Sequence, residues 1–385
     1  MPKFPSSIKS KLPKTGTTIF TIMSGLANEV GAINLSQGFP DFMCNEELIK
    51  LVDQYVRKGF NQYAPMPGII PLREAIAEKV STLYGINYNP DTEITIAPGG
   101  TEAIYAAITA VIDEDDEVII FEPAYDSYTP AIELNKGIPV YIELQAPDYK
   151  IDWDTVRKRL NPKTKMIMIN TPHNPTGSVL TRDDMKQLEK ITKDTDIIIL
   201  SDEVYEHIIF DEIQHESVLR YPKLAERSFV VYSFGKTYHN TGWKMGYCLA
   251  PEALTKEFRR VHQFIVFSTN TPYQYAFADL MKKKELYLEL GAFYQKKRDF
   301  FLKGIEGSRF SVKPALGSYF QLLGYNKITD EKDTEYAIRL TKEIGVASIP
   351  VSVFYHRNID HKMLRFCFAK SEDTLKRATE KLQKV

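Results

Sequence analysis

The 385-residue sequence predicts an α/β protein, in which a large domain with a mostly parallel central sheet flanked by helices is joined to a smaller α+β domain. Strand-like runs alternate with helical patterns between residues 93 and 250, as in α/β domains. Runs such as Ile197–Leu200 are apolar throughout, which suits strands covered on both faces. Beyond about Thr271 long helical segments and shorter strands follow. We therefore assign residues 43–275 to the large domain, and residues 1–42 with 276–385 to the small domain.

The predicted helices begin and end at recognisable residues. A helix is expected over residues 17–30, where apolar side chains form one stripe and Gly31 follows as a stop. Pro71 opens another helix, because proline suits the first helical turn, and Gly85 ends it. Further helices are expected at 46–58, 101–112, 182–193, 285–304 and 374–383, and strands at 32–35, 93–97, 117–121, 166–170, 196–201, 228–232, 245–250, 310–313, 319–323 and 363–369.

Composition and charge exclude several classes of protein. The 49 basic and 50 acidic residues nearly cancel, so the sequence does not suggest a nucleic-acid partner or an anionic membrane surface. The three cysteines are far apart, which predicts neither a metal site nor a disulfide framework and fits a reducing compartment. Residues 1–13 lack the apolar segment of a secretory signal, and no run approaches the ~20 apolar residues of a membrane helix. We expect a soluble, cytoplasmic protein.

Polar groups follow four of the predicted strands, where open α/β sheets bind ligands. They are Gly99-Gly100-Thr101, Asn174, Asp202 with Tyr205, and Lys236. Their common placement predicts one shared site.

Lys236 follows a buried strand within a few residues, in a turn that contains Gly235. It is either a nucleophilic amine made reactive by its surroundings or a solvated lysine in a loop. A phosphate-binding loop is excluded, because that motif requires glycine at the position of Val230.

The other polar groups also allow both a functional and an ordinary structural interpretation. Gly99-Gly100-Thr101 opens a helix, and the free N–H groups at a helix start bind anions such as phosphate. Ser233 and Lys244 could add a hydroxyl and a positive charge to the same phosphate. The alternative is an ordinary Gly-Gly turn, which is common before helices of α/β proteins. A buried Asp202 requires a partner, which is either a protonated ring nitrogen of a ligand or a structural arginine. Asn174 lies in a proline-rich turn that either aims its amide or only reverses the chain.

Arg365 lies in the strand-like run 363–369, where alternate residues are apolar. The period of two places Arg365 on the face opposite to Leu364, Phe366 and Phe368. An arginine in such a strand suits bidentate capture of a carboxylate; the alternative is a solvated arginine on a surface strand.

Together these motifs resemble the class I pyridoxal-phosphate aminotransferases of fold type I. The resemblance rests on the runs 233–247, 174–177 and 202–205. The runs 35–42, 61–63 and 365–370 are similar to the kynurenine aminotransferase-like branch, and residues 12–20 and 123–128 to its bacterial methionine aminotransferases. The similarity extends over nearly the whole chain.

The resemblance implies a role for each candidate residue, with pyridoxal 5'-phosphate as cofactor. Lys236 would hold the cofactor covalently and then carry the proton of the substrate, so it is the catalytic residue. The cofactor would be bound by Asp202 at its ring nitrogen, Asn174 and Tyr205 at its ring oxygen, Tyr125 at its ring face, and Gly100, Thr101, Ser233 and Lys244 at its phosphate. In a homodimer, Tyr63 would reach the phosphate of the neighbouring subunit. Arg365, Asn174 and the Gly38 backbone would bind the substrate carboxylate, with Phe20 in an aromatic side-chain pocket that also includes Tyr63, Tyr125 and Phe354.

The resemblance also implies the reaction, in which an amino acid donates its amino group and a 2-oxo acid receives it by a ping-pong route. Methionine and aromatic amino acids are the expected donors, because we identify no second arginine for a distal carboxylate. The alternatives are kynurenine transamination or β-elimination from cysteine S-conjugates, and a non-catalytic ligand-binding protein of the same fold. Lys244 departs from the wider class, where arginine is usual, and this substitution gives up a bidentate contact to phosphate.

Overall fold

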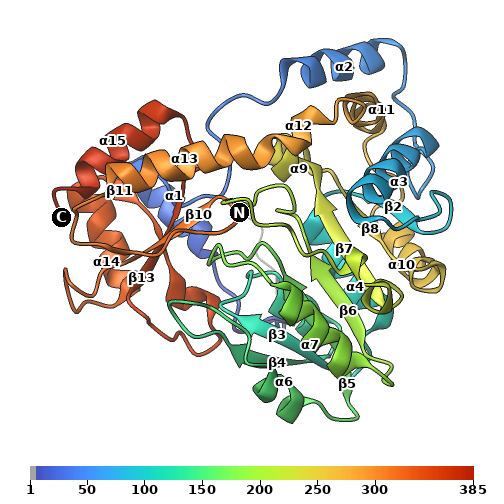
Figure 1. Cartoon of the computed structure of the whole chain (residues 1–385), viewed down its shortest axis with the longest axis horizontal. Helices are drawn as coiled ribbons and strands as arrows, with labels where there is room; N and C mark the ends of the chain where they lie inside the picture. Colours follow the sequence, from blue (N-terminus) through green and yellow to red (C-terminus); the bar gives the residue numbers. More distant parts are fainter. Residues whose placement is uncertain (1–5) are drawn as a thin grey trace.

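The computed structural model describes residues 6–385. The prediction that residues 1–13 are not a secretory signal therefore lies outside the described residues for positions 1–5. A seven-stranded sheet and a smaller four-stranded sheet form two halves, and the long helix α13 runs from one half toward the other (Figure 1). The helices are α1 Ile19–Val30, α2 Glu46–Arg57, α3 Ile70–Tyr84, α4 Gly100–Val111, α5 Tyr128–Leu134, α6 Trp153–Arg159, α7 Arg182–Thr192, α8 Pro222–Ala225, α9 Phe234–Thr237, α10 Glu252–Ile265, α11 Thr271–Leu280, α12 Glu285–Leu288, α13 Leu290–Gly304, α14 Asp333–Arg339 and α15 Glu372–Leu382.

The large sheet has the order β2-β8-β7-β6-β5-β3-β4. Its strands are β2 Ile94–Ala97, β3 Glu117–Glu122, β4 Ile138–Glu143, β5 Thr164–Asn170, β6 Ile198–Asp202, β7 Ser228–Ser233 and β8 Gly246–Leu249. Only β8 runs antiparallel to its neighbours, which confirms a mostly parallel sheet. β4 is absent from the predicted strands because Pro139 interrupts its short apolar run; at the edge of the sheet a missing N–H is tolerated.

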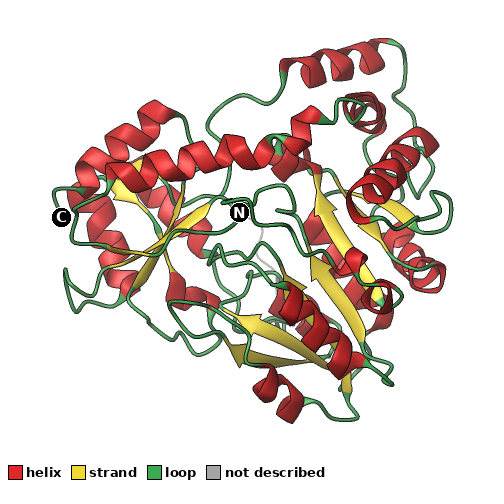
Figure 2. Cartoon of the chain, in the orientation of Figure 1, coloured by secondary structure: helices red, strands yellow, loops and turns green. Residues whose placement is uncertain are grey.

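Helices cover the large sheet on both faces (Figure 2). Ile119 and Ile167 pack with helices α3, α6, α7 and α11, whereas their neighbours Val118 and Met168 pack with α4, α5 and α10. This alternation explains why the strands are apolar throughout, as the sequence predicted.

The smaller half contains the sheet β12-β13-β10-β9 and the pair β1-β11. These strands are β1 Ile33–Asn34, β9 Ser311–Val312, β10 Phe320–Gly324, β11 Val346–Ala347, β12 Ile349–Pro350 and β13 Met363–Cys367. Residues from both ends of the chain share its core: Met23 and Leu35 pack with Tyr294, Phe366 and Leu375. The predicted helix over 285–304 is interrupted at Glu289 and forms α12 and α13.

The parallel strands β5, β6 and β7 end at one edge of the large sheet, close to the N-terminus of α4. Within the described part of the chain no helix is both long and apolar enough to cross a membrane. Cys248 and Cys367 are buried, and all three cysteines are free.

Candidate active site

A cavity of about 140 Å³ opens at the carboxyl edge of β5, β6 and β7. Every cofactor-site residue that the sequence predicts lines it except Tyr63: Gly100, Thr101, Tyr125, Asn174, Asp202, Tyr205, Ser233, Lys236 and Lys244. The structure therefore brings together groups that are up to 144 positions apart in the chain, from Gly100 to Lys244.

Lys236 lies in the single turn of helix α9, directly after β7. Its Nζ donates a hydrogen bond to the Tyr319 hydroxyl at 2.9 Å. Burial lowers the pKa of Lys236 to about 8. The side chain is therefore a partly buried amine with a specific partner, and the solvated loop lysine that the sequence left open is excluded.

Asp202 is the last residue of β6 and is 4% exposed. Its Oδ2 accepts a hydrogen bond from the Tyr128 hydroxyl at 2.6 Å, and its Oδ1 accepts one from the Val204 N–H at 3.3 Å. Burial raises the pKa of Asp202 to about 6, although these hydrogen bonds act in the opposite direction. The carboxylate lines the cavity, and among residues 6–385 no arginine pairs with it. The structural arginine that the sequence left open as a partner is therefore excluded.

Arg365 enters the site from β13 of the smaller half and is 1% exposed. One guanidinium nitrogen donates to Asn174 Oδ1 at 2.8 Å and another to the Ser36 carbonyl at 2.9 Å. The ring of Phe320 lies 3.9 Å from the guanidinium carbon. Burial lowers the pKa of Arg365 to about 10, so the group stays cationic at neutral pH, and the solvated surface arginine is excluded.

The anion-binding end of the cavity is built on the start of α4. Gly99 has a φ of 90°, a conformation that favours glycine, and a Cβ there would approach the Lys244 side chain to 3.3 Å. A Cβ on Gly100 would approach Val204 to 3.1 Å. The two glycines thus leave the first N–H groups of α4 open toward the cavity, with a lysine beside them.

Arg365 contacts Asn174 but does not itself line the cavity, and three further predicted residues also lie outside it. Phe20 projects from α1, with its ring 5.2 Å from the Arg365 guanidinium carbon and 6.0 Å from the Phe354 ring. The Gly38 carbonyl accepts a hydrogen bond from Tyr319 at 2.5 Å. Tyr63 is 81% exposed and does not line the cavity of its own chain.

The family model for class I and II aminotransferases matches residues 30–382. The chain belongs to this family. It is 48% identical to the methionine aminotransferase of Escherichia coli over 98% of both chains, and 32% identical to a kynurenine–oxoglutarate transaminase of Dictyostelium discoideum over 96% of this chain and 94% of the relative. The crystal structure of YbdL from Escherichia coli, described as having a methionine aminotransferase function, superposes with a TM-score of 0.97 at 48% identity, over 99% of this chain and 100% of the other.

Members of this aminotransferase family depend on pyridoxal 5'-phosphate, and the fold is that of their fold type I. Two residues of the site escaped sequence reasoning. Tyr128 hydrogen-bonds Asp202, and Tyr319 hydrogen-bonds Lys236, from 74 and 83 positions away in the chain. Tyr128 begins a short helix and Tyr319 directly precedes a buried strand, so both side chains are indistinguishable in the sequence from ordinary core tyrosines.

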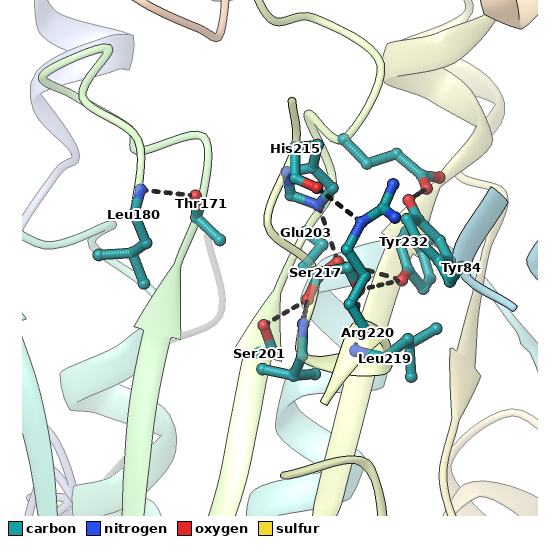
Figure 3. Close-up of polar contacts among 12 residues, drawn as sticks. Tyr84, Thr171, Leu180, Ser201, Glu203, His215, Ser217, Leu219, Arg220 and Tyr232 are labelled. Carbon is teal, nitrogen blue, oxygen red and sulfur yellow. Dashed lines mark hydrogen bonds and ion pairs between the residues drawn. The ribbon is translucent and has the colours of Figure 1, made fainter. Parts of the chain in front are cut away.

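A second buried polar cluster is centred on Glu203, which directly follows Asp202 in the chain (Figure 3). Glu203 is fully buried and accepts hydrogen bonds from Ser201 at 2.8 Å, His215 at 2.9 Å and Tyr232 at 3.1 Å. The neighbouring Glu206 accepts from Lys79 and from Tyr84. Within the segment 201–206, Asp202, Val204 and Tyr205 line the cavity, whereas Ser201, Glu203 and Glu206 belong to this cluster.

Proposed function

We propose that this aminotransferase moves the amino group of methionine and of aromatic amino acids to a 2-oxo acid by a ping-pong reaction with pyridoxal 5'-phosphate. The observation that carries the proposal is that the partly buried Lys236 amine and the buried Asp202 carboxylate line one cavity, and that the buried Arg365 guanidinium is hydrogen-bonded to Asn174 in its wall. Buried ionisable groups with perturbed pKa values that meet in a cavity are typical of catalytic sites.

The cavity fits the cofactor in three respects. Gly100 and Thr101 at the start of α4, with Ser233 and Lys244, would bind the phosphate. The Asp202 carboxylate faces the cavity from a buried position and would hold a proton on the ring nitrogen. Asn174, Tyr205 and Tyr125 would bind the ring oxygen and the ring face. When bound, pyridoxal 5'-phosphate supplies an electron sink that makes the hydrogen on the substrate Cα acidic.

Lys236 would attach the cofactor and then move the proton. Its pKa of about 8, lowered by burial, leaves a larger neutral fraction at pH 7–8 than an ordinary lysine has. A neutral Nζ accepts the proton from the substrate Cα and becomes an ammonium group, which then donates that proton. Catalysis by a single amine in both directions requires a pKa near the working pH.

Arg365, Asn174 and the Gly38 backbone would bind the substrate α-carboxylate. The substrate side chain would extend into an adjoining cavity of about 950 Å³, which Tyr125, Phe354 and Tyr141 line together with residues 14–19 and 22. Within the described chain no arginine lines that cavity; its basic side chains are Lys14 and His356, and His356 is paired with Glu122. The lack of an arginine favours methionine and aromatic side chains over a second carboxylate.

A homodimer would complete the site, with Tyr63 reaching the phosphate of the neighbouring subunit. This is supported by the exposure of Tyr63 at 81%, Phe264 at 87% and Phe267 at 58%, because apolar side chains exposed together are typical of interfaces. The ring of Tyr63 lies 5.2 Å from that of Phe267. The three free cysteines support a reducing compartment, the cytoplasm.

We further propose the domain division at 43–275 against 1–42 with 276–385. It is supported by the core that Met23 and Leu35 share with the C-terminal residues. The contacts of α11 with α2 and α3 suggest that the large domain extends a few residues beyond 275.

A screen of half-reactions tests the function. The enzyme with bound cofactor is mixed with each amino acid in turn, and the loss of the cofactor's visible absorbance is followed. Methionine, phenylalanine, tyrosine and kynurenine are expected to react fastest. A tenfold larger kcat/KM for aspartate than for methionine, about 1.4 kcal/mol in the opposite direction, would contradict the proposal. Borohydride reduction followed by peptide mass spectrometry is expected to find the cofactor on Lys236, and pyruvate release from a cysteine S-conjugate would reveal β-elimination.

A further inference from the structure

The hydroxyl of Tyr319 lies between the Lys236 amine and the backbone of the N-terminal segment. It accepts a hydrogen bond from Lys236 Nζ at 2.9 Å and donates one to the Gly38 carbonyl at 2.5 Å. Tyr319 is fully buried, and it comes from the smaller half of the molecule, whereas Lys236 comes from the large sheet. One hydroxyl therefore joins the two halves at the reacting amine.

The direction of both hydrogen bonds follows from the chemistry of the partners. A carbonyl oxygen only accepts, so the single proton of Tyr319 is directed to Gly38. The lone pairs of the hydroxyl are then left for an N–H of Lys236. Burial raises the pKa of Tyr319 well above its ordinary value, so the hydroxyl keeps its proton over the whole working range of the enzyme.

The position of the hydroxyl is fixed by packing on all sides. The Tyr319 ring lies 4.9 Å from the ring of Phe320, 5.1 Å from that of Tyr205 and 5.7 Å from that of Tyr294. Gly38 approaches so closely that a Cβ there would lie 2.5 Å from Phe320 and 3.3 Å from Tyr319. Both ends of the hydrogen-bonded chain are thus held in place.

We propose that Tyr319 is a positioning residue for the catalytic lysine, which holds the free Lys236 amine at the point where it exchanges a proton with the substrate Cα. This inference rests on the proposed function. When the substrate has released Lys236 from the cofactor, the amine has four single bonds in its side chain about which to rotate, and a fixed acceptor removes most of that freedom. Because the same hydroxyl bonds Gly38, the amine and the segment proposed to bind the substrate carboxylate keep a constant distance.

The proton balance is simple. Neutral Lys236 takes the proton from Cα, becomes an ammonium group and later gives that proton up. Tyr319 accepts a hydrogen bond from the amine in both states and neither gains nor loses a proton, since its own remains with Gly38.

Tyr319→Phe removes the hydroxyl and keeps the ring. Tyr294→Phe is the matched control, because Tyr294 belongs to the same buried aromatic group and its hydroxyl has no hydrogen-bond partner among residues 6–385. In both variants the half-reaction with methionine is followed by stopped flow, with hydrogen or deuterium on Cα. We expect the rate constant at saturating methionine to fall about tenfold or more in Tyr319→Phe only. The isotope effect is expected to be no smaller than in the wild type, and the dissociation constant for methionine to change less than twofold.

A second measurement does not depend on activity. The cofactor-free protein is pulsed with a trace of acetic anhydride at each pH, and the labelling of Lys236 is quantified by peptide mass spectrometry. A hydrogen-bond acceptor stabilises the ammonium form, so the pKa of Lys236 is expected to be lower in Tyr319→Phe than in the wild type and unchanged in Tyr294→Phe. The other charged and titratable groups that face the amine are the same in both variants: Asp202, Tyr205, Lys244, Arg365 and Cys367.

Equal rates and equal Lys236 titration in Tyr319→Phe and Tyr294→Phe would overturn the inference. A loss of rate with a lower isotope effect would also overturn it, because proton transfer would then not be the step affected. If Tyr319→Phe does not fold, 3-fluorotyrosine at position 319 replaces it; its more acidic hydroxyl is a weaker acceptor, and an unchanged rate would count against the inference. If wild-type Lys236 carries no borohydride-fixed cofactor, the proposed function itself fails, which is a distinct outcome.

Discussion

The Tyr128 hydroxyl donates a hydrogen bond to Asp202 Oδ2 at 2.6 Å, and both side chains are buried. This bond favours the ionised carboxylate, which burial disfavours. In Tyr128→Phe the pKa of Asp202 is therefore expected to rise above its value of about 6. The acidic limb of the pH profile of kcat/KM should move to higher pH, and cofactor affinity at pH 7 should fall about tenfold.

Spectroscopic titration of the cofactor across pH 5–9 measures both effects. Tyr149→Phe is a suitable control, since the buried Tyr149 hydroxyl has no hydrogen-bond partner in residues 6–385. An acidic limb that stays in place in Tyr128→Phe would show that the tyrosine does not act through the carboxylate.

The buried Asp202 carboxylate, which we propose binds the cofactor, destabilises the cofactor-free fold at neutral pH. Its pKa is raised in the folded protein from 3.8 to about 6, so its contribution to stability is most favourable below pH 4 and is lost as the pH rises to 6. Asp202→Asn should therefore increase the free energy of unfolding of the cofactor-free protein above pH 6, by up to about 3 kcal/mol. Urea unfolding at pH 5 and pH 7.5 measures the difference, which should be larger at pH 7.5; transamination should be lost.

Arg365→Lys tests recognition of the carboxylate. A lysine keeps the charge but does not reach Asn174 and the Ser36 carbonyl together, so it loses the orientation that the guanidinium has. We expect kcat/KM for methionine to fall about 100-fold, equivalent to ~2.7 kcal/mol, mostly through KM. The corresponding amine without a carboxylate should react equally slowly with both proteins. Arg298→Lys, at a buried arginine paired with Asp211 away from the cavity, should leave KM unchanged.

Mixed dimers test the proposed role of Tyr63 across the interface. Tyr63→Ala and Lys236→Ala subunits are each expected to have little activity alone. When they are co-expressed, one of the two sites of each mixed dimer combines an intact Lys236 with an intact Tyr63 from the neighbour. About half of the dimers are mixed and each has one working site, so activity should recover to about a quarter of wild type. No recovery in mixed dimers purified with two different tags would mean that Tyr63 serves its own subunit or none.

Glu203 is predicted to matter for stability far more than for cofactor binding. Glu203→Gln removes a buried charge that three side chains and the Val218 N–H contact, which should cost about 2–4 kcal/mol of unfolding free energy. Guanidinium unfolding measures the loss of unfolding free energy. The control variant is Glu257→Gln, at an exposed glutamate paired with Arg260, where a change below 1 kcal/mol is expected.

The residues predicted correctly as neighbours are those with a local signal. Lys236, Asp202 and Asn174 each follow an apolar strand, and parallel strands bring their carboxyl ends together, so spacing along the chain was sufficient. Tyr319 and Tyr128 have no such signal, because their hydroxyl partners are determined by tertiary packing. Two-residue strands such as β11 and β12 are too short to show a period.

The two cavities are lined largely by different segments of the chain, which has a practical consequence for engineering. Of the residues predicted to bind the cofactor, Asp202 and Tyr205 lie in the segment that the Glu203 and Glu206 cluster holds. Part of the adjoining cavity is lined by residues between 122 and 141, including Tyr125, and its other walls come from residues 14–19, residue 22 and residues 353–356. A mutational library confined to those walls would vary side-chain selectivity while the cofactor groups keep their support. Libraries that include 201–206 would instead consist mainly of unfolded members, because half of that segment is buried in polar contacts that few residues can replace.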